Sequence, residues 1–535
     1  MKKTVLATVA LAAAVFSLAS CGGKSNGKAA TSSSASSSAA EFIFNNGTEP
    51  QSLDPSKIQG VPEHRLYMAL FEGLVSYDAK TNEAVPGVAE SWSLSEDGTV
   101  LTFKLRNTTW SDGTPITAQT FVDSWLYYLS PETAAEYAYM PAAVIKGAEA
   151  YNAGKAGKET VGLRAVDDTT FEVTLVGPVP YAVDMMAHYS FAPLPLHAME
   201  KFGNDWTKPG NFVGNGPFVL SEWLPQDHIS VVPNDKYWNK ANVFLSKVTF
   251  LTIENETTAY NKYKNGELDW DTSVPLEMLD EIKLTNDYHV SPQISSYYYE
   301  LNFNNPILAD VRVRKALAKS INTQELVDKV TKGGQIPATS FCPPMSGFTP
   351  ATGNPYDVEA AKALLAEAGY PNGAGFPKMT VIYNTNEGHK KIAEYVQQEW
   401  KKNLGIDVEL SNMEWGTFLE ERQHNNFEIA RAGWVGDYMD PSNFLELLLS
   451  TSGNNDGRYN NPKYDELIKK AATMPAGAER MQVLHDAEEL MMTEEQALIP
   501  FYYYVSQNMI DLDKWDGWYT NPLDVHPWVG IKPKR

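Results

Sequence analysis

Residues 379–432 read MTVIYNTNEGHKKIAEYVQQEWKKNLGIDVELSNMEWGTFLEERQHNNFEIARA. Short apolar runs typical of buried strands alternate in this stretch with the three-to-four spacing of amphipathic helices. This alternation favours an α/β domain with parallel strands, because a crossover helix joins consecutive parallel strands. The predicted elements are strands at 379–383, 406–410 and 427–432 and helices at 389–403 and 417–424.

Two helices are predicted just before this stretch. Each begins at an aspartate, Asp310 or Asp357, that precedes an amphipathic run. The first is expected to run as one helix to Gly333-Gly334, and the second to Ala368, before Gly369.

The region from residue 94 to 176 has a different pattern, in which short strands flank tight turns. It is expected to form an α+β block, and a run of prolines after residue 176 predicts a boundary there. The predicted elements are two strands within 94–106 around Asp97-Gly98, a helix at 118–129 and a strand pair within 161–176 around Asp167-Asp168.

The composition excludes several classes of protein. The 535 residues are 43% hydrophobic and 11% aromatic, which excludes a disordered chain and predicts two to four domains. The formal net charge is −22 without a Lys/Arg cluster, so we predict no nucleic-acid binding. With two cysteines, Cys21 and Cys342, a disulfide framework is not expected.

The N-terminus has the features of an export signal. Two lysines precede an apolar run from 5 to 18, too short for a membrane-spanning helix, so residues 1–20 are predicted to be a signal peptide. Leu18-Ala19-Ser20-Cys21-Gly22 resembles the lipobox of bacterial lipoproteins, which implies a lipidated Cys21 and a body tethered to the extracytoplasmic face of the cell membrane. Residues 21–40 are expected to form a flexible linker rich in serine and alanine.

Signatures of a secreted enzyme are not apparent. The Gly-x-Ser-x-Gly spacing occurs only at 23–27 in the predicted linker, where no strand precedes it, and there is no His-Glu-x-x-His motif. Cys342 precedes two prolines, where an ordinary thiol is expected. The nine histidines show no i, i+4 pairing, so no metal site is predicted, and no cofactor is expected.

Residues 427–441, FEIARAGWVGDYMDP, carry the most informative chemistry. Arg431 lies on a strand that leads into a loop with Trp434 and Asp437, and the intervening glycines let another backbone approach closely. Such a segment can bind a zwitterion, with its carboxylate on Arg431 and its ammonium on Asp437. The alternative is a structural ion pair between Arg431 and Asp437, with Trp434 in the core.

Together with this block, motifs spread over some 400 residues resemble the peptide-binding receptors of bacterial ABC importers, the family 5 solute-binding proteins. The resemblance covers almost all of residues 41–535. The other segments that carry it are QSLDP (51–55), GVPE (60–63), PGVAESW (86–92), WSDGTPITA (110–118), NGPF (215–218), YYYELN (297–302) and DVRVRKAL (310–317).

The resemblance implies a two-lobed α/β fold of the class II periplasmic-binding-protein type, with an extra α+β domain and a ligand enclosed between lobes that close by a hinge motion. It further implies that the chain is not an enzyme. The implied division is domain I at 41–71, 196–294 and 505–535, domain II, the extra domain, at 72–195, and domain III at 295–504.

The resemblance also implies a peptide site. Asp437 would pair with the α-ammonium of the peptide, and Arg431 and His389 with the carboxylate of peptides of different lengths. A lysine within 329–332 would share that second role. Val61, Tyr137, Gly433 and Val435 match positions that pair with the ligand backbone, and Trp415, Trp434 and Tyr298 match pocket walls.

One departure from the family pattern is visible. The best-studied pattern has a disulfide whose cysteines would fall near Ser295 and at Val435, and neither is present here. Closure or rigidity near the site is therefore expected to differ.

The resulting hypothesis is an extracytoplasmic, monomeric oligopeptide receptor that delivers short peptides to ABC permease subunits. One alternative keeps the fold and binds a dipeptide, a peptide pheromone, nickel, haem or a sugar. The others are a secreted cell-wall enzyme and a surface adhesin that does not transport.

Overall fold

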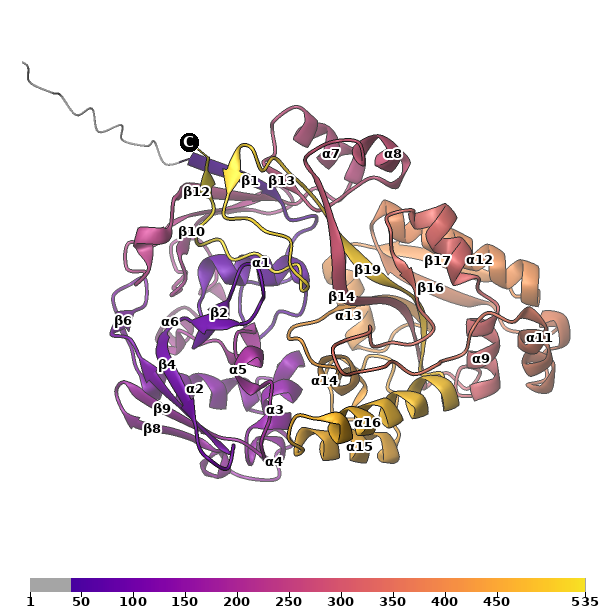
Figure 1. The fold of residues 1–535 in the computed structure, drawn as a ribbon, viewed down its shortest axis with the longest axis horizontal. Coiled ribbons are helices and arrows are strands. Elements are labelled where there is room, and N and C mark those ends of the chain that lie inside the picture. The colour runs from indigo at the N-terminus through magenta and orange to yellow at the C-terminus, as the bar shows by residue number, and fades with distance from the viewer. Residues whose placement is uncertain (1–39, 535) are drawn as a thin grey trace, which may run out of the picture. The chain divides into compact units, whose positions relative to one another are not determined.

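A mixed sheet of eleven strands runs through residues 40–534, the part of the chain that the computed structural model describes (Figure 1). The predicted leader, Cys21 and most of the predicted linker lie outside the described residues. The strand order is β10 (Phe218–Leu224), β11 (His228–Pro233), β12 (Leu245–Leu251), β1 (Ala40–Asn45), β13 (Trp270–Asp271), β19 (Leu498–Ile510), β14 (Tyr288–Leu301), β18 (Ile429–Val435), β16 (Met379–Asn384) and β17 (Val408–Met413), with β15 (Ile336–Pro337) beside β19.

The two longest strands, β14 and β19, connect the two halves of this sheet. They pair antiparallel from Tyr288 with Met509 to Glu300 with Leu498, and the register shifts between Pro292 and Ser296. One end of β19 pairs with β13, while the other end of β14 pairs with β18. Figure 1 shows the two strands running together between the two sets of elements. A chain segment shared by both halves is what a hinged, two-lobed fold needs.

The α/β prediction for residues 379–432 is confirmed. The order is β16, α12 (Glu387–Leu404), β17, α13 (Trp415–Gln423) and β18, and β16 pairs parallel with both β17 and β18. Trp400 of α12 is fully buried, and its Nε1 donates a hydrogen bond to the carbonyl of Leu317 at 3.0 Å. The sheet is nevertheless mixed, because β18 pairs antiparallel with β14.

The prediction of one helix from Asp310 to Gly334 is wrong. Asp310 does cap α9 (Val311–Lys319), but the chain then breaks and restarts as α10 (Thr323–Leu326), followed by a π-helical segment at Val327–Thr331. The cause is Asn322, whose side chain accepts a hydrogen bond from the backbone N–H of Glu325 and so begins a new helix. The prediction for 357–368 is confirmed by α11 (Val358–Glu367), with Asp357 as its N-cap.

The predicted α+β elements are also present. A four-stranded sheet has the order β4 (Ala89–Leu94), β5 (Val100–Leu105), β9 (Thr170–Thr174) and β8 (Leu163–Asp167), and α2 spans Ala118–Leu129 as predicted. Two-stranded pairs are β2 (Val75–Tyr77) with β3 (Ala84–Pro86), β6 (Thr108–Thr109) with β7 (Pro115–Ile116) and β20 (Trp515–Asp516) with β21 (Lys532–Pro533). The remaining α-helices are α1 (Val61–Leu70), α3 (Tyr139–Val144), α4 (Ala148–Asn152), α5 (Ala182–Met185), α6 (Leu196–Phe202), α7 (Glu256–Lys264), α8 (Leu279–Ile282), α14 (Ser442–Leu445), α15 (Pro462–Ala472) and α16 (Ala478–Glu488).

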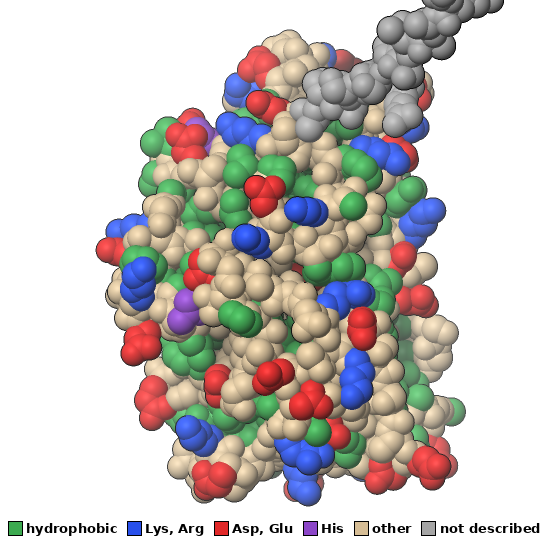
Figure 2. Space-filling view, turned by 90° about the vertical axis from the view of Figure 1, so that its left-hand side faces the viewer, with side chains coloured by type: hydrophobic (Ala, Val, Ile, Leu, Met, Phe, Trp, Pro, Cys, Tyr) green, Lys and Arg blue, Asp and Glu red, His purple; other side chains and the backbone are tan. Residues whose placement is uncertain are grey.

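The surface carries the net negative charge in dispersed form. Acidic and basic side chains both lie scattered over the face shown in Figure 2, and neither sign gathers into one patch there. Within residues 40–534, no helix combines the length and apolar character needed to span a bilayer.

Candidate functional site

Two adjoining cavities lie between segments that are far apart in the sequence. The first has a volume of about 280 Å³ and the second about 270 Å³. They share part of their walls, and the two together are called the cleft. The residues that line both are Val61, Arg65, Gln293, Val435, Tyr504 and Asp524.

The structure brings the predicted site residues to this cleft. All except His389 line the first cavity: Val61, Tyr137, Tyr298, Trp415, Arg431, Gly433, Trp434, Val435 and Asp437. His389 lines the second. The predicted residues therefore lie around one cleft, although they come from segments almost 380 residues apart.

Strand β18 forms one wall of the cleft with an open backbone edge. On one side it pairs with β14 from Ile429 to Val435, but on the other side β16 contacts it at Ile429 and Ala430 alone. Within the described part of the chain, residues 431–435 have no strand partner on that second side. A free strand edge is where an extended peptide can add by backbone hydrogen bonds.

Gly433 keeps this edge accessible. A Cβ placed at this position would lie 2.8 Å from Tyr504 Oη and 3.0 Å from an Arg431 guanidinium nitrogen, so the ends of these two side chains would have to shift. Glycine lets them stay in place, and a ligand backbone meets no side chain at that point.

Asp437 lies at one end of the cleft, just beyond the end of β18. Its backbone N–H donates to Asn443 Oδ1 at 3.0 Å, and its Oδ2 accepts from Asn443 Nδ2 at 3.2 Å. Trp434 Nε1 also donates to Asn443 Oδ1, at 2.9 Å. Burial raises the pKa of Asp437 to about 7, and the bond from Asn443 offsets this in part. Because few nearby groups stabilise its negative charge, this carboxylate can gain by pairing with a cation.

His188 contacts the same carboxylate from behind. Its Nε2 lies 3.3 Å from Asp437 Oδ1, while its Nδ1 accepts from the backbone N–H of Ser190 at 3.3 Å. The proton of a neutral ring is therefore assigned to Nε2, toward the carboxylate. Burial, and then His64, lowers the pKa of His188 well below its ordinary value. At neutral pH the ring does not supply a charge that would neutralise Asp437.

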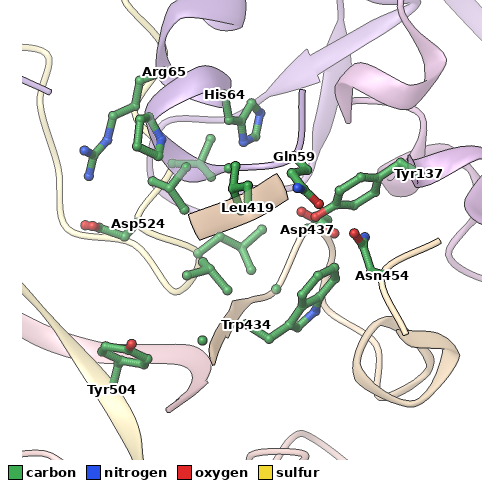
Figure 3. A pocket seen from close by; sticks show the side chains of 18 of the residues that line it. Gln59, His64, Arg65, Tyr137, Leu419, Trp434, Asp437, Asn454, Tyr504 and Asp524 are labelled. Atoms are coloured by element: carbon green, nitrogen blue, oxygen red, sulfur yellow. The ribbon is translucent and has the colours of Figure 1, made fainter. Parts of the chain in front are cut away.

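Aromatic side chains enclose this end. Tyr137 and Trp434 stack with ring centroids 5.9 Å apart, and Tyr137 also lies 4.8 Å from the His188 ring. Figure 3 shows Asp437 with Gln59, Tyr137 and Asn454 at one end of the pocket and Tyr504, Arg65 and Asp524 away from it.

Arg431 and His389 lie toward the other end. Arg431 donates to Tyr504 Oη at 2.7 Å and to Asn384 Oδ1 at 3.3 Å, both uncharged acceptors, so its charge is not neutralised. His389 Nδ1 lies 3.3 Å from Tyr297 Oη. Burial, and then Arg431, lowers the pKa of His389 well below its ordinary value. This ring is thus a neutral hydrogen-bonding group.

Arg431 and Asp437 do not form the structural ion pair that the sequence left open. They engage different partners, Tyr504 and Asn443 respectively. The two lysines within 329–332 line neither cavity, and Lys329 forms an exposed ion pair with Glu325 at 2.6 Å. Ser295 and Val435, where the family pattern has its disulfide, are directly opposed on β14 and β18.

Several cleft residues are not apparent from the sequence motifs. Arg422, His64, Gln293, Arg65 and Asp524 line the cleft as isolated residues in segments without a distinctive pattern. His188 is a single histidine near a run of prolines. The GVPE motif is the one signal nearby, and it extends into α1, which carries His64 and Arg65.

Residues 83–456 match the family described as bacterial extracellular solute-binding proteins, family 5. The chain belongs to this family. It is 41% identical over 498 residues to the periplasmic oligopeptide-binding protein OppA of Escherichia coli K12, an alignment that covers 90% of each chain. A crystal structure of a periplasmic oligopeptide-binding protein from Borrelia burgdorferi superposes with a TM-score of 0.90 at 38% identity, covering 92% of this chain and all of that one. The two-lobed α/β fold expected from the sequence is thus confirmed.

Two structures of one family member differ in their likeness to this chain. The murein tripeptide binding protein MppA of Escherichia coli superposes with a TM-score of 0.88 at 40% identity, covering 92% of this chain and 99% of that one. Its unliganded open form gives 0.62 at 39% identity, with 93% and 98% covered. The conformation described here therefore differs from that open form. Among residues 40–534, no cluster of histidine, cysteine and carboxylate side chains has the arrangement of a metal site.

Proposed function

We propose that the protein is an extracytoplasmic receptor that captures short peptides by their backbone and charged ends and delivers them to an ABC permease. The observation that carries this proposal is the open edge of β18 at residues 431–435, which leads to the buried Asp437. An extended peptide on that edge would bring its α-ammonium to Asp437, with its carboxylate toward Arg431 or His389.

These features suit a receptor for varied peptides. The backbone and the two termini are common to all peptides, so affinity from them does not depend on sequence. Side chains would extend into the two cavities, where retained water can satisfy their polar groups. The ligand backbone would be met, mostly through main chain, around Val61, Tyr137, Gly433 and Val435. The pocket walls would be formed by Trp415, Trp434 and Tyr298.

The division into lobes and the location belong to the same proposal. Domain I (41–71, 196–294 and 505–535) and domain III (295–504) would close over the ligand, with domain II (72–195) as the extra domain. Trp415 Nε1 donates to Glu63 Oε1 at 3.1 Å across that division, as a closing contact would. A lipid on Cys21 would hold the monomeric receptor at the outer face of the cell membrane.

Calorimetry on the mature chain, stripped of bound ligand by unfolding and refolding, tests the proposal. The titrants are tetra-alanine and its N-acetylated counterpart. An enclosed carboxylate without its cation costs about 3–5 kcal/mol, so the acetylated peptide should bind hundreds-fold more weakly or not at all. Equal affinity for both peptides would contradict the role of Asp437, and binding of neither would contradict the peptide function.

A further inference from the structure

Three arginines line the first cavity, and one of them has no polar partner. Arg422 forms ion pairs with Glu300 at 2.8 Å and with Asp456 at 3.0 Å. Arg431 is held by Tyr504 and Asn384. The side chain of Arg65 makes no hydrogen bond or ion pair with any residue in 40–534, and its Nε is buried without an acceptor, although its backbone carbonyl accepts from Trp528 Nε1 at 2.9 Å.

The guanidinium of Arg65 is nevertheless held in place. It lies over the ring of Phe44, 5.2 Å from the centroid, and Phe44 is fully buried on β1. Cation–π contact orients a guanidinium without using its hydrogen-bond donors. Burial lowers the pKa of Arg65 from its ordinary value, even though Asp524 and Asp271 act in the opposite direction. The nearby carboxylates therefore do not fully compensate the charge.

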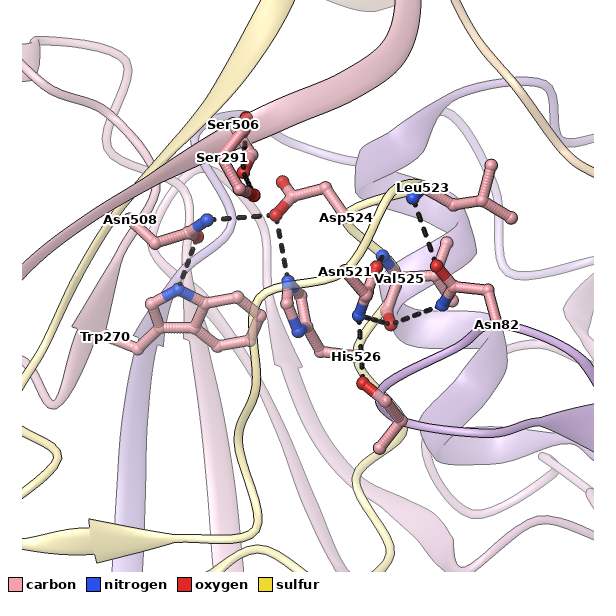
Figure 4. A network of polar contacts seen from close by, with 11 residues as sticks. Asn82, Trp270, Ser291, Ser506, Asn508, Asn521, Leu523, Asp524, Val525 and His526 are labelled. Carbon is pink, nitrogen blue, oxygen red and sulfur yellow. Dashed lines mark hydrogen bonds and ion pairs between the residues drawn. The ribbon is translucent and has the colours of Figure 1, made fainter. Parts of the chain in front are cut away.

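Asp524 faces the same space from the C-terminal segment. Its Oδ1 accepts from Asn508 Nδ2 and from His526 Nε2, both at 2.9 Å, as Figure 4 shows. Asn82 and Asn521 bind the neighbouring backbone at Leu523 and Val525, which anchors this segment. The carboxylate of Asp524 thus has hydrogen-bond partners already, while the guanidinium of Arg65 has none.

The position of Arg65 points to the interior of a bound peptide. Arg65 lines both cavities, whereas Asp437 lines the first alone and His389 the second alone. It also lies four residues after Val61 on α1, on the same helix face. A peptide that met Val61 through its backbone would direct a nearby interior side chain at Arg65.

We propose that Arg65 forms a subsite for the carboxylate of an acidic side chain in the interior of the peptide. The proposal rests on the proposed peptide function. It adds a preference among peptides that backbone and termini do not supply, because a guanidinium whose two Nη groups have no protein partner can bind a carboxylate through two parallel hydrogen bonds.

Calorimetry with matched tetrapeptides tests this subsite. The set is tetra-alanine and its derivatives with Glu, Gln or Lys at position 2 or position 3. At one of these positions Glu should bind roughly tenfold more tightly than Gln, as expected for a charged hydrogen-bonded pair. In Arg65→Gln this ratio should fall to about one or two, while the affinity for tetra-alanine should change far less than the affinity for the Glu peptide.

Two variants separate a local from a general effect. Arg65→Lys keeps the positive charge but loses the planar pair of guanidinium donors, so it should retain part of the preference for Glu. Arg164→Gln removes an exposed arginine of the extra domain, which pairs with Glu172, and should leave the ratio unchanged. A Glu/Gln ratio of one or less at both positions, or a ratio that survives Arg65→Gln, would overturn the inference. A Lys preference would assign the subsite to Asp524 instead. Failure of tetra-alanine itself to bind would instead overturn the peptide function.

Discussion

The two ends of the cleft differ in how narrowly they define a ligand. At the Asp437 end, one buried carboxylate is surrounded by Tyr137, Trp434 and His188 and held by Asn443. At the other end, the second cavity is lined by uncharged polar groups, among them Gln335, Asn386 and Gln507, and by a neutral His389, beside the ionisable side chains of Arg65, Glu256 and Asp524. One rigid charged group sets the register of a ligand, while several modest ones accept a terminus at different distances. On the proposed peptide function, we expect tolerance of peptide length at the second end alone.

Removal of the single carboxylate should therefore have the largest effect. Asp437→Asn keeps the shape and the bond from Asn443 but leaves the peptide ammonium without a counter-charge. Affinity for tetra-alanine should fall by about 100-fold or more by calorimetry, without a loss of thermal stability. Asp513→Asn, an exposed position in the C-terminal segment, is the matched control. Unchanged binding in Asp437→Asn would remove the distinction between the two ends.

The same end should make binding dependent on pH. Asp437 must be ionised to bind an ammonium, and its pKa in the free protein is about 7. Affinity should therefore fall as pH decreases through 7, roughly tenfold between pH 7.5 and 6. The free energy of unfolding should change in the opposite direction, because folding raises the pKa of Asp437. The stability that the protonated Asp437 contributes is fully present below its unfolded pKa and is lost as pH rises through 7.

Asp437→Asn provides the control for this pH effect. His188 and His389 have pKa values well below the ordinary value, and that of His64 is about 4, so these rings should not titrate between pH 6 and 7.5. Weak binding by Asp437→Asn should lose most of this slope; the other cleft carboxyl that titrates in this interval is Glu256 of the second cavity, whose pKa burial raises to about 7. A slope that persists in the variant would assign the titration to another group.

A single change at the far end should have a smaller effect. Arg431→Gln removes one of several groups able to meet the peptide carboxylate, so affinity should fall about three- to tenfold. Amidation of the peptide C-terminus should cost a similar factor, and less in the variant than in the wild type. A loss as large as that of Asp437→Asn would show that both ends are equally strict.

A cross-link in the shared wall should have the smallest effect on binding. Ser295 and Val435 are opposed on neighbouring antiparallel strands, and Val435 lines both cavities. The double variant Ser295→Cys/Val435→Cys should form a disulfide and gain about 2–4 kcal/mol of stability against unfolding. Peptide affinity should stay within a few-fold of the wild type. The reduced form of the same variant is the control, and a large oxidation-dependent loss of affinity would mean that this wall must move during binding.

Local signals predicted much of the fold. The elements of 379–432, the helix at 118–129 and the hairpin around Asp167-Asp168 depend on periodicity and turns, and all are present. The failure at 310–334 was also local, since one asparagine, Asn322, restarted the helix. The long pairing of β14 with β19 was not predicted, because it joins residues about 200 positions apart. Neither strand shows alternating burial, since β19 is buried along nearly its whole length and β14 is buried from Ser295 onward.

The candidate site was also predicted only in part. Asp437, Arg431 and Trp434 lie in one conspicuous block, and family resemblance added the other candidates. Arg65, His188 and Asp524 come from three distant segments, and each is unremarkable in its own context. Their importance follows from burial and from which neighbours they have or lack, which are properties of the folded chain.

Cys342 gives the protein a built-in reporter. This thiol is fully buried, and burial raises its pKa well above the ordinary value, so it should react with alkylating reagents when the surrounding core opens. If Cys21 carries lipid, Cys342 is the only free thiol of the mature chain. The rate at which it is labelled then measures opening of the fold without an engineered probe. A bound peptide should slow that labelling in proportion to its occupancy, so ligands could be ranked by their protection of a single sulfur atom.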